Sequence, residues 1–96
     1  MLIRIVRMSF DPSKTEEFIE IFKSSKDKIK ASEGCLHVEL LQDLDTPNVF
    51  STYSLWEEDK YLQQYRHSEL FKNTWAKTKV LFNDKPQAYS YEKKIG

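Results

Sequence analysis

The sequence predicts an α+β fold whose elements follow the order β-α-β-β-α-β. Three observations lead to this prediction. The segments Leu2–Phe10, Cys35–Asp43 and Val49–Trp56 are rich in β-branched and aromatic residues, as strands are. The stretches after the first and third of these strands space their apolar residues as helices do. The segment Ala88–Lys93 alternates in the manner of a final strand.

The first predicted strand carries apolar residues on both faces. Alternate positions of a strand share a face, so Arg4 and Arg7 are expected to point to opposite faces. Because both faces are partly apolar, we expect both to be covered. Leu2, Val6, Met8 and Phe10 lie on the face of Arg4, and Ile3, Ile5 and Ser9 lie on the face of Arg7.

A helix is expected between this strand and Gly34. Asp11-Pro12-Ser13 breaks the strand, and Ser13 with Glu16 fits a capping box. The helix is expected to continue to about Ala31, and Gly34 is a stop signal. The apolar residues with helical spacing are Phe18, Ile19, Phe22 and Ile29.

The second half begins with a hairpin and continues with a helix that restarts. Asp45, Pro47 and Asn48 set the hairpin turn. The acidic residues 57–59 suit a helix start, because negative charge there complements the helix dipole. Ser68 fits a second N-cap, so the helix is expected to kink or restart there. Phe71, Trp75, Thr78 and Phe82 are expected to line one side as far as Phe82.

This order predicts a ferredoxin-like fold, with a four-stranded antiparallel sheet and two helices on one face. The other face of the sheet remains open. Pairing two such faces makes a dimeric α+β barrel, which accounts for the two apolar faces of the first strand. We expect one domain over residues 1–96, completed by a second copy as a homodimer.

Composition excludes several classes of function. The chain has 15 Lys and Arg and 15 Asp and Glu, so neither a nucleic acid nor a membrane surface is an expected partner. No long apolar run or signal-peptide pattern occurs, so we expect a soluble, cytoplasmic protein. Cys35 is the only cysteine and is expected to be a small buried hydrophobic residue. The two histidines, His37 and His67, are too far apart for a local metal-ligand pair.

A set of positions that runs from Phe10 and Pro12 through Gly34 and Trp56 to Phe71 matches the pattern of a known family. On these residues the chain resembles the antibiotic biosynthesis monooxygenase family of small dimeric α+β barrel proteins over nearly its whole length. Most of the matching positions are structural, so the resemblance is more specific for the fold than for an activity. The matching residues are Phe10, Pro12, Phe18, Phe22, Gly34, Cys35, Asp45, Pro47, Asn48, Trp56, Leu62, Ser68 and Phe71.

The resemblance implies oxidation of an aromatic, quinol or anthrone-like substrate by molecular oxygen, with no metal or flavin cofactor. Such enzymes deprotonate the substrate inside an apolar pocket, and the carbanion reduces oxygen directly. This chain has Ser54 where the family often has a Glu, and Tyr65 and Leu70 where relatives often have His. Haem-degrading relatives use an Asn, a Trp and a His axial ligand at positions that here are Val6, Tyr65 and Trp75. Because none of the three is retained, a haem iron would lack its ligand, and haem binding is disfavoured.

Six residues are candidates for the site. His37 could accept a proton, because its ordinary pKa is near neutrality, and it is expected to share a strand face with Cys35 and Glu39. The hydroxyls of Tyr53 and Tyr65 could donate hydrogen bonds to a substrate oxygen. Ordinary structural roles are the alternative for all three. The substrate-binding candidates are Trp56, Trp75 and Arg7.

Arg4 and Arg7 have two expected roles between them. At least one is expected to pair with a carboxylate at the subunit interface. For the other, anion binding is an alternative to an ordinary structural role.

Two functions follow from these residues. The first is a cofactor-independent monooxygenase, which the family resemblance favours. The alternative is a non-catalytic dimer that binds an apolar small molecule in the same aromatic cavity. Residue chemistry alone does not separate them, because this fold hosts several functions.

Overall fold

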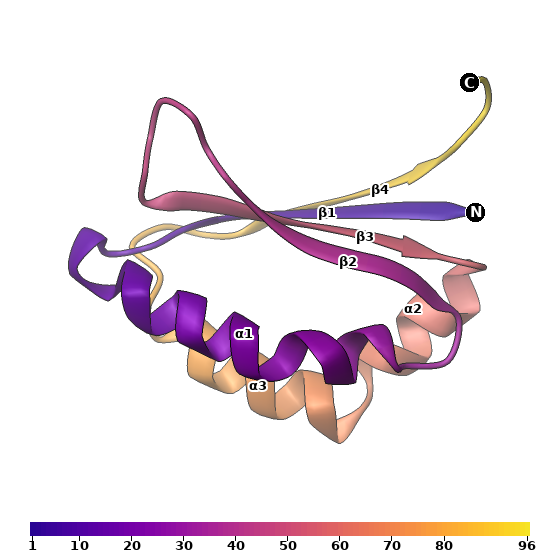
Figure 1. The fold of residues 1–96 in the computed structure, drawn as a ribbon, viewed down its shortest axis with the longest axis horizontal. Helices are drawn as coiled ribbons and strands as arrows, with labels where there is room; N and C mark the ends of the chain where they lie inside the picture. Colours follow the sequence, from indigo (N-terminus) through magenta and orange to yellow (C-terminus); the bar gives the residue numbers. More distant parts are fainter.

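Four antiparallel strands form one sheet, and three helices cover one of its faces, in a computed structural model that describes residues 1–96 (Figure 1). The strand order is β2-β3-β1-β4, so the first strand is central and the last strand lies at an edge. The predicted ferredoxin-like arrangement is confirmed. The elements are β1 (Leu2–Ser9), a short 3-10 turn (Pro12–Lys14), α1 (Thr15–Lys30), β2 (Cys35–Gln42), β3 (Val49–Trp56), α2 (Asp59–Arg66), α3 (Glu69–Lys79) and β4 (Gln87–Glu92).

The strand register fixes which side chains face the helices. Arg4 pairs with Ser54 on β3 and with Ser90 on β4, and directly opposed residues share a face. The alternation predicted for the first strand is confirmed, since Arg4 lies on the helix-covered face and Arg7 on the open face. Ile3, Ile5, Tyr53, Leu55, Tyr89 and Tyr91 share the open face with Arg7.

A β-bulge at the start of β2 breaks the alternation expected for that strand. Cys35 pairs with Trp56, but His37 pairs with Leu55, so Leu36 is an extra residue with no partner on β3. Cys35 and His37 therefore point to opposite faces, and the expectation that they share one is wrong. Cys35 is buried under the helices, whereas His37 shares the open face with Glu39.

The start of α1 differs from the predicted capping box. The side chain of Asp11 accepts hydrogen bonds from the backbone N–H and the hydroxyl of Ser13, at 2.9 Å and 2.8 Å. Ser13 consequently lies in the 3-10 turn, and Lys14 is the N-cap of α1 without a side-chain hydrogen bond. The predicted inner face is confirmed, because Phe18, Phe22 and Ile29 are buried.

The predicted restart at Ser68 is confirmed. The hydroxyl of Ser68 accepts a hydrogen bond from the backbone N–H of Phe71 at 3.1 Å and begins α3 after α2 has ended at Arg66. The helix ends at Lys79, before the predicted limit at Phe82. Phe82 instead forms a single β-bridge with Phe10, which ties the end of this segment to the end of β1.

The core lies between the sheet and the helices. Phe10 and Trp56 are its most buried large side chains, and the ring of Phe10 stacks on that of Phe18 with centroids 4.1 Å apart. The open face of the sheet has no cover within the chain, and its edge strand β4 is exposed at every position (Figure 1). None of the helices is long and apolar enough to span a bilayer.

Candidate functional site

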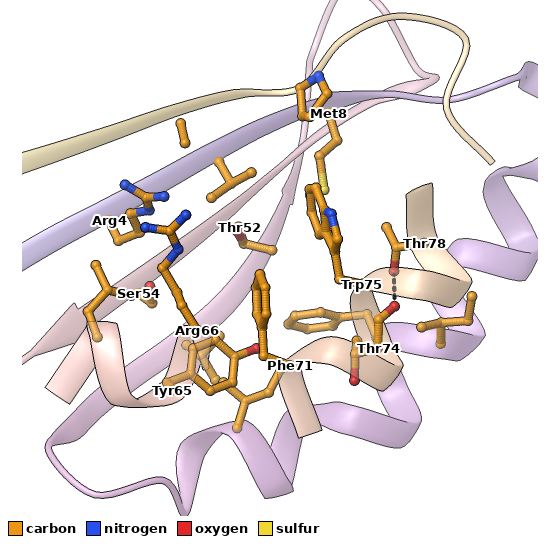
Figure 2. Close-up of a pocket in the computed structure, with 18 of the residues that line it drawn as sticks. Arg4, Met8, Thr52, Ser54, Tyr65, Arg66, Phe71, Thr74, Trp75 and Thr78 are labelled. Atoms are coloured by element: carbon orange, nitrogen blue, oxygen red, sulfur yellow. Dashed lines mark hydrogen bonds between the residues drawn. The ribbon is translucent and has the colours of Figure 1, made fainter. Parts of the chain in front are cut away.

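A cavity of about 300 Å³ lies between the sheet and the helices, and 13 of the 20 residues around it are hydrophobic. β1 and β3 form its roof, α1 contributes one side, and α2 and α3 contribute the other (Figure 2). Pockets of this size and polarity are typical small-molecule sites. The cavity is therefore the candidate site.

Aromatic rings form a continuous wall of the cavity. The rings of Trp56 and Tyr65 stack with centroids 5.3 Å apart, and Tyr65 meets Phe71 edge-on at 5.3 Å. Phe71 in turn stacks on Trp75, with centroids 5.8 Å apart and planes inclined by 10°. All four residues line the cavity, so a flat aromatic molecule would contact ring faces and edges along its length.

Ser54 places a buried hydroxyl at the roof of the cavity. The hydroxyl oxygen accepts a hydrogen bond from the indole N–H of Trp56 at 3.0 Å. A serine hydroxyl also has one proton to donate, and this proton has no acceptor within the chain. Ser54 can therefore donate a hydrogen bond to an oxygen atom of a ligand.

Tyr65 provides a second hydroxyl that stays protonated. Burial, with a smaller contribution from the nearby Cys35, raises the pKa of Tyr65 to about 12. The phenol is consequently neutral at physiological pH, and its hydroxyl has no hydrogen-bond partner within the chain. Tyr65 is therefore suited to donate a hydrogen bond or a proton, and it is a poor general base.

Two arginine side chains meet at one end of the cavity. The heads of Arg4 on β1 and Arg66 on α2 lie beside each other (Figure 2). Arg4 donates to the hydroxyl of Ser90 at 2.9 Å, and Arg66 donates to the side-chain oxygen of Gln63 at 3.3 Å. Neither guanidinium has a carboxylate within 4.0 Å.

Burial lowers the pKa of Arg4 from its ordinary value, and repulsion from Arg66 lowers it further. Asp59 offsets part of this effect at longer range. Arg4 nevertheless stays charged, because an arginine in a protein does not lose its proton.

The cavity contains no proton acceptor of the usual kind. Its lining includes no His, Asp or Glu, and its only formal charges are those of Arg4 and Arg66. No group of three or more His, Cys, Asp or Glu residues is placed to hold a metal ion. The environment therefore favours a bound anion.

Three of the six residues predicted for the site line this cavity, and three do not. Tyr65, Trp56 and Trp75 contribute to the aromatic wall. His37, Tyr53 and Arg7 lie on the open face of the sheet.

Polar contacts within the chain engage two of the three open-face residues. His37 Nε2 lies 3.1 Å from a carboxylate oxygen of Glu39, and Arg7 lies 3.8 Å from Asp43. Arg7 thus has a carboxylate partner within its own chain, and the pair expected at a subunit interface stays a prediction. The predicted role of Arg7 in substrate binding stays a prediction as well.

Arg4, Ser54 and Arg66, at one end of the cavity, were not among the predicted site residues. The sequence showed that Arg4 lies on the strand face opposite to Arg7. It also showed Ser54 as a departure from the family pattern. Arg66 gave no signal, because an arginine before a helix end is usually solvated. It enters the cavity because α2 ends at Arg66 and packs its preceding turns against β3.

The fold and the cavity together define a class of small α+β proteins with an aromatic-lined cavity between sheet and helices. The family model described as antibiotic biosynthesis monooxygenase matches residues 1–77. The chain belongs to this family.

Solved structures agree with this assignment at the level of the fold. A conserved protein from Methanosarcina mazei is 25% identical, with a TM-score of 0.91 over 98% of this chain and 94% of that chain. A protein described as antibiotic biosynthesis monooxygenase is 16% identical, with a TM-score of 0.92 over 99% of this chain and 100% of that chain. The protein Rv0793 from Mycobacterium tuberculosis is 15% identical, with a TM-score of 0.90 over 99% of this chain and 96% of that chain. A sequence search of curated proteins found no match.

Proposed function

We propose that this chain is a monooxygenase that oxidises a small quinol or anthrone-like aromatic with molecular oxygen, without metal or flavin. The observation that carries the proposal is the aromatic cavity with its two hydroxyl donors, Ser54 and Tyr65, in a chain of the antibiotic biosynthesis monooxygenase family. Trp56 and Trp75 bind the flat substrate as walls of the cavity, and residues 1–96 act as one domain.

The reaction begins with an ionised substrate. An anthrone or quinol that loses a proton becomes an electron-rich anion, and the positive charges of Arg4 and Arg66 favour that form in the cavity. The anion transfers its electron pair to oxygen, and protonation of the product gives a carbon-bound hydroperoxide. Cleavage of the O–O bond then releases water and leaves a carbonyl, so one oxygen atom enters the product and the other leaves as water.

Tyr65 and Ser54 act on the oxygen atoms that gain charge. Their hydroxyls donate hydrogen bonds to the substrate oxyanion, and this preorganised donation lowers the barrier. Tyr65 also supplies the proton for the hydroperoxide, since its phenol is neutral. His37, Tyr53 and Arg7 are on the opposite sheet face, so any role that they have requires the second subunit.

The proposed active form is a homodimer joined through the open sheet face. Tyr89 and Tyr91 are 43% and 53% exposed there, and Leu41 is 46% exposed. Soluble proteins rarely leave such an apolar sheet face in water. The polar side chains of this face already have partners within the chain, Arg7 with Asp43 and His37 with Glu39, which leaves the exposed apolar residues for a self-complementary two-fold contact.

The test is oxygen uptake with a panel of quinols and anthrones, without added metal or flavin. We expect saturable uptake above the rate of autoxidation. Tyr65→Phe, which removes only the hydroxyl, should lower kcat about a hundredfold. Lys72→Gln, on the exposed side of α3, should leave it unchanged.

The panel also tests the open-face candidates through His37→Ala and Tyr53→Phe. No uptake by the folded protein, or full activity in both Tyr65→Phe and Ser54→Ala, would contradict the proposed function.

A second candidate function is a non-catalytic binding protein for an apolar aromatic molecule. The observation that favours it is the lack of any His, Asp or Glu in the cavity lining, which leaves no residue to accept the substrate proton. Saturable binding of panel compounds without oxygen consumption would support this second function over the first.

A further inference from the structure

Arg4 and Arg66 place two positive charges side by side at one end of an otherwise uncharged cavity, with no carboxylate within 4.0 Å of either. The chain contains 15 acidic residues, yet none of them lines the cavity. The two charges repel each other, Arg4 being partly desolvated and Arg66 exposed, and this repulsion lowers the stability of the empty protein.

The two guanidinium groups keep most of their hydrogen-bonding capacity. A guanidinium has five N–H donors, and within the chain each of these two has a single neutral acceptor, Ser90 for Arg4 and Gln63 for Arg66. The free donors and the shared positive charge suit an oxyanion, because planar guanidinium groups bind such anions in a bidentate manner.

The cavity is polarised along its length. Arg4, Arg66 and Ser54 lie together toward one end, while Trp75, Thr74 and Thr78 lie toward the other (Figure 2). At that far end the Thr78 hydroxyl already donates to the backbone oxygen of Thr74 at 2.8 Å. The hydroxyl of Thr74 and the indole N–H of Trp75 are also free to donate at the far end, so the arginine end differs from it by its two positive charges. The aromatic wall extends away from these charges.

We propose that the ligand of this cavity is a flat aromatic molecule that is already anionic when it binds. Its charged oxygen atoms lie against Arg4 and Arg66, and its rings lie along Tyr65, Phe71 and Trp75. The inference rests on the proposed function only in placing the substrate in this cavity. It adds the class of substrate, an aromatic oxyanion, whose charge is either a carboxylate or an ionised phenol.

Calorimetric titration of the full chain with three probes tests the inference. The probes are naphthoate, naphthol and the neutral naphthalenemethanol, which share one ring system. Naphthoate is expected to bind at least about tenfold more tightly than naphthalenemethanol, because hydrogen bonds to charged groups contribute more than neutral ones. Naphthol, titrated through the pH range in which it ionises, distinguishes a phenolate site from a carboxylate site.

The variants locate the charge. Arg4→Gln and Arg66→Gln should each weaken naphthoate binding about tenfold and leave naphthalenemethanol binding unchanged. Arg4→Lys should retain part of the affinity. Lys72→Gln removes one positive charge outside the cavity, so it controls for net charge and should bind naphthoate as the parent protein does.

Three results would overturn the inference. One is equal affinity for the anionic and neutral probes. Another is loss of naphthoate binding in Arg7→Gln but not in Arg4→Gln, since Arg7 lies on the other face. The third is a lower unfolding free energy of unliganded Arg4→Gln, which would make the arginine structural. Binding is measured without turnover, so a negative oxygen-uptake assay beside selective anion binding would reject the oxygenase and leave this inference standing.

Discussion

At the scale of single residues, the hydrogen-bonding character of the cavity depends on which of its side chains stay protonated. Tyr65 keeps its phenol proton because burial disfavours the phenolate. The hydroxyl of Ser54 accepts a hydrogen bond from the indole of Trp56 and still has its own proton to donate. Arg4 keeps its charge despite burial. Every polar group at the arginine end of the cavity is therefore a donor, which selects for an oxygen-rich, electron-rich ligand.

The pKa of Tyr65 predicts how stability responds to alkaline pH. Its pKa is raised from 10.0 to about 12 in the folded chain, so between these values the folded state holds a proton that the unfolded state has lost. The free energy of unfolding should be unaffected by this group below pH 10 and should fall by up to about 3 kcal/mol as the pH rises to 12.

Urea denaturation at a series of alkaline pH values measures this dependence. Tyr65→Phe has no phenol to ionise, so its stability should fall less steeply than that of the parent protein above pH 10. Parallel slopes for the two proteins would show that the phenol is not desolvated in the folded state.

At the scale of elements, the junction between α1 and β2 controls how α2 packs. Gly34 follows α1 with a φ of +77°, a left-handed conformation that residues with a side chain adopt at a cost. A β-carbon built on Gly34 would also clash with the ring of Tyr61 on α2. Directly after Gly34, the bulge at Leu36 turns Cys35 inward against Trp56.

Replacement of Gly34 by alanine should therefore be costly. We expect Gly34→Ala to lower the free energy of unfolding by at least about 2 kcal/mol, from backbone strain together with the clash. Denaturation followed by tryptophan fluorescence measures the loss. Gly96→Ala is the matched control, because that glycine also has a positive φ but has no neighbour within 4 Å. A Gly34→Ala protein as stable as this control would contradict the close packing of Tyr61.

The sequence predicted the elements well because their signals are local. Ser68 predicted the restart of the helix, and the spacing of Phe18, Phe22 and Ile29 predicted the buried face of α1. The prediction was wrong at His37, because the extra residue Leu36 shifts the alternation of the strand by one position. The pattern of apolar residues does not reveal this shift. The alternation that placed Cys35, His37 and Glu39 on one face holds only after the bulge.

The candidate site was predicted less completely than the fold. Tyr65, Trp56 and Trp75 were anticipated as aromatic residues of a cavity, and all three line it. The pairing of Arg4 with Arg66 was not, since 62 positions separate them and only the packing of α2 against the sheet brings them together. Long-range convergence of this kind has no local sequence signal.

At the scale of the whole molecule, a single subunit has one covered and one uncovered sheet face. The covered face holds both hydrophobic clusters of the core and the cavity. The uncovered face combines exposed tyrosines with an Arg7–Asp43 ion pair and a His37–Glu39 contact within the chain, which fits the proposed contact with a second copy.

Tyr89→Glu tests the proposed dimer. In one subunit Tyr89 is 43% exposed, so the substitution should leave the subunit folded. In the dimer it would bury an unpaired carboxylate, and we expect light scattering after size exclusion to show a monomer. Val80→Glu is the control, because Val80 is 73% exposed at the end of α3, on the helical side. A Tyr89→Glu protein that stays dimeric would place the subunit contact elsewhere.

A molecule bound in the cavity between sheet and helices would be part of what keeps the chain folded. A ligand that binds only the folded form raises its stability with concentration, by about 2.7 kcal/mol at a hundred times the dissociation constant. For an anion at Arg4 and Arg66, relief of their repulsion is part of the binding free energy and so lowers the dissociation constant. Resistance to heat and to proteolysis should accordingly follow the supply of the small molecule, so preparations stripped of it will survive less well than those that retain it.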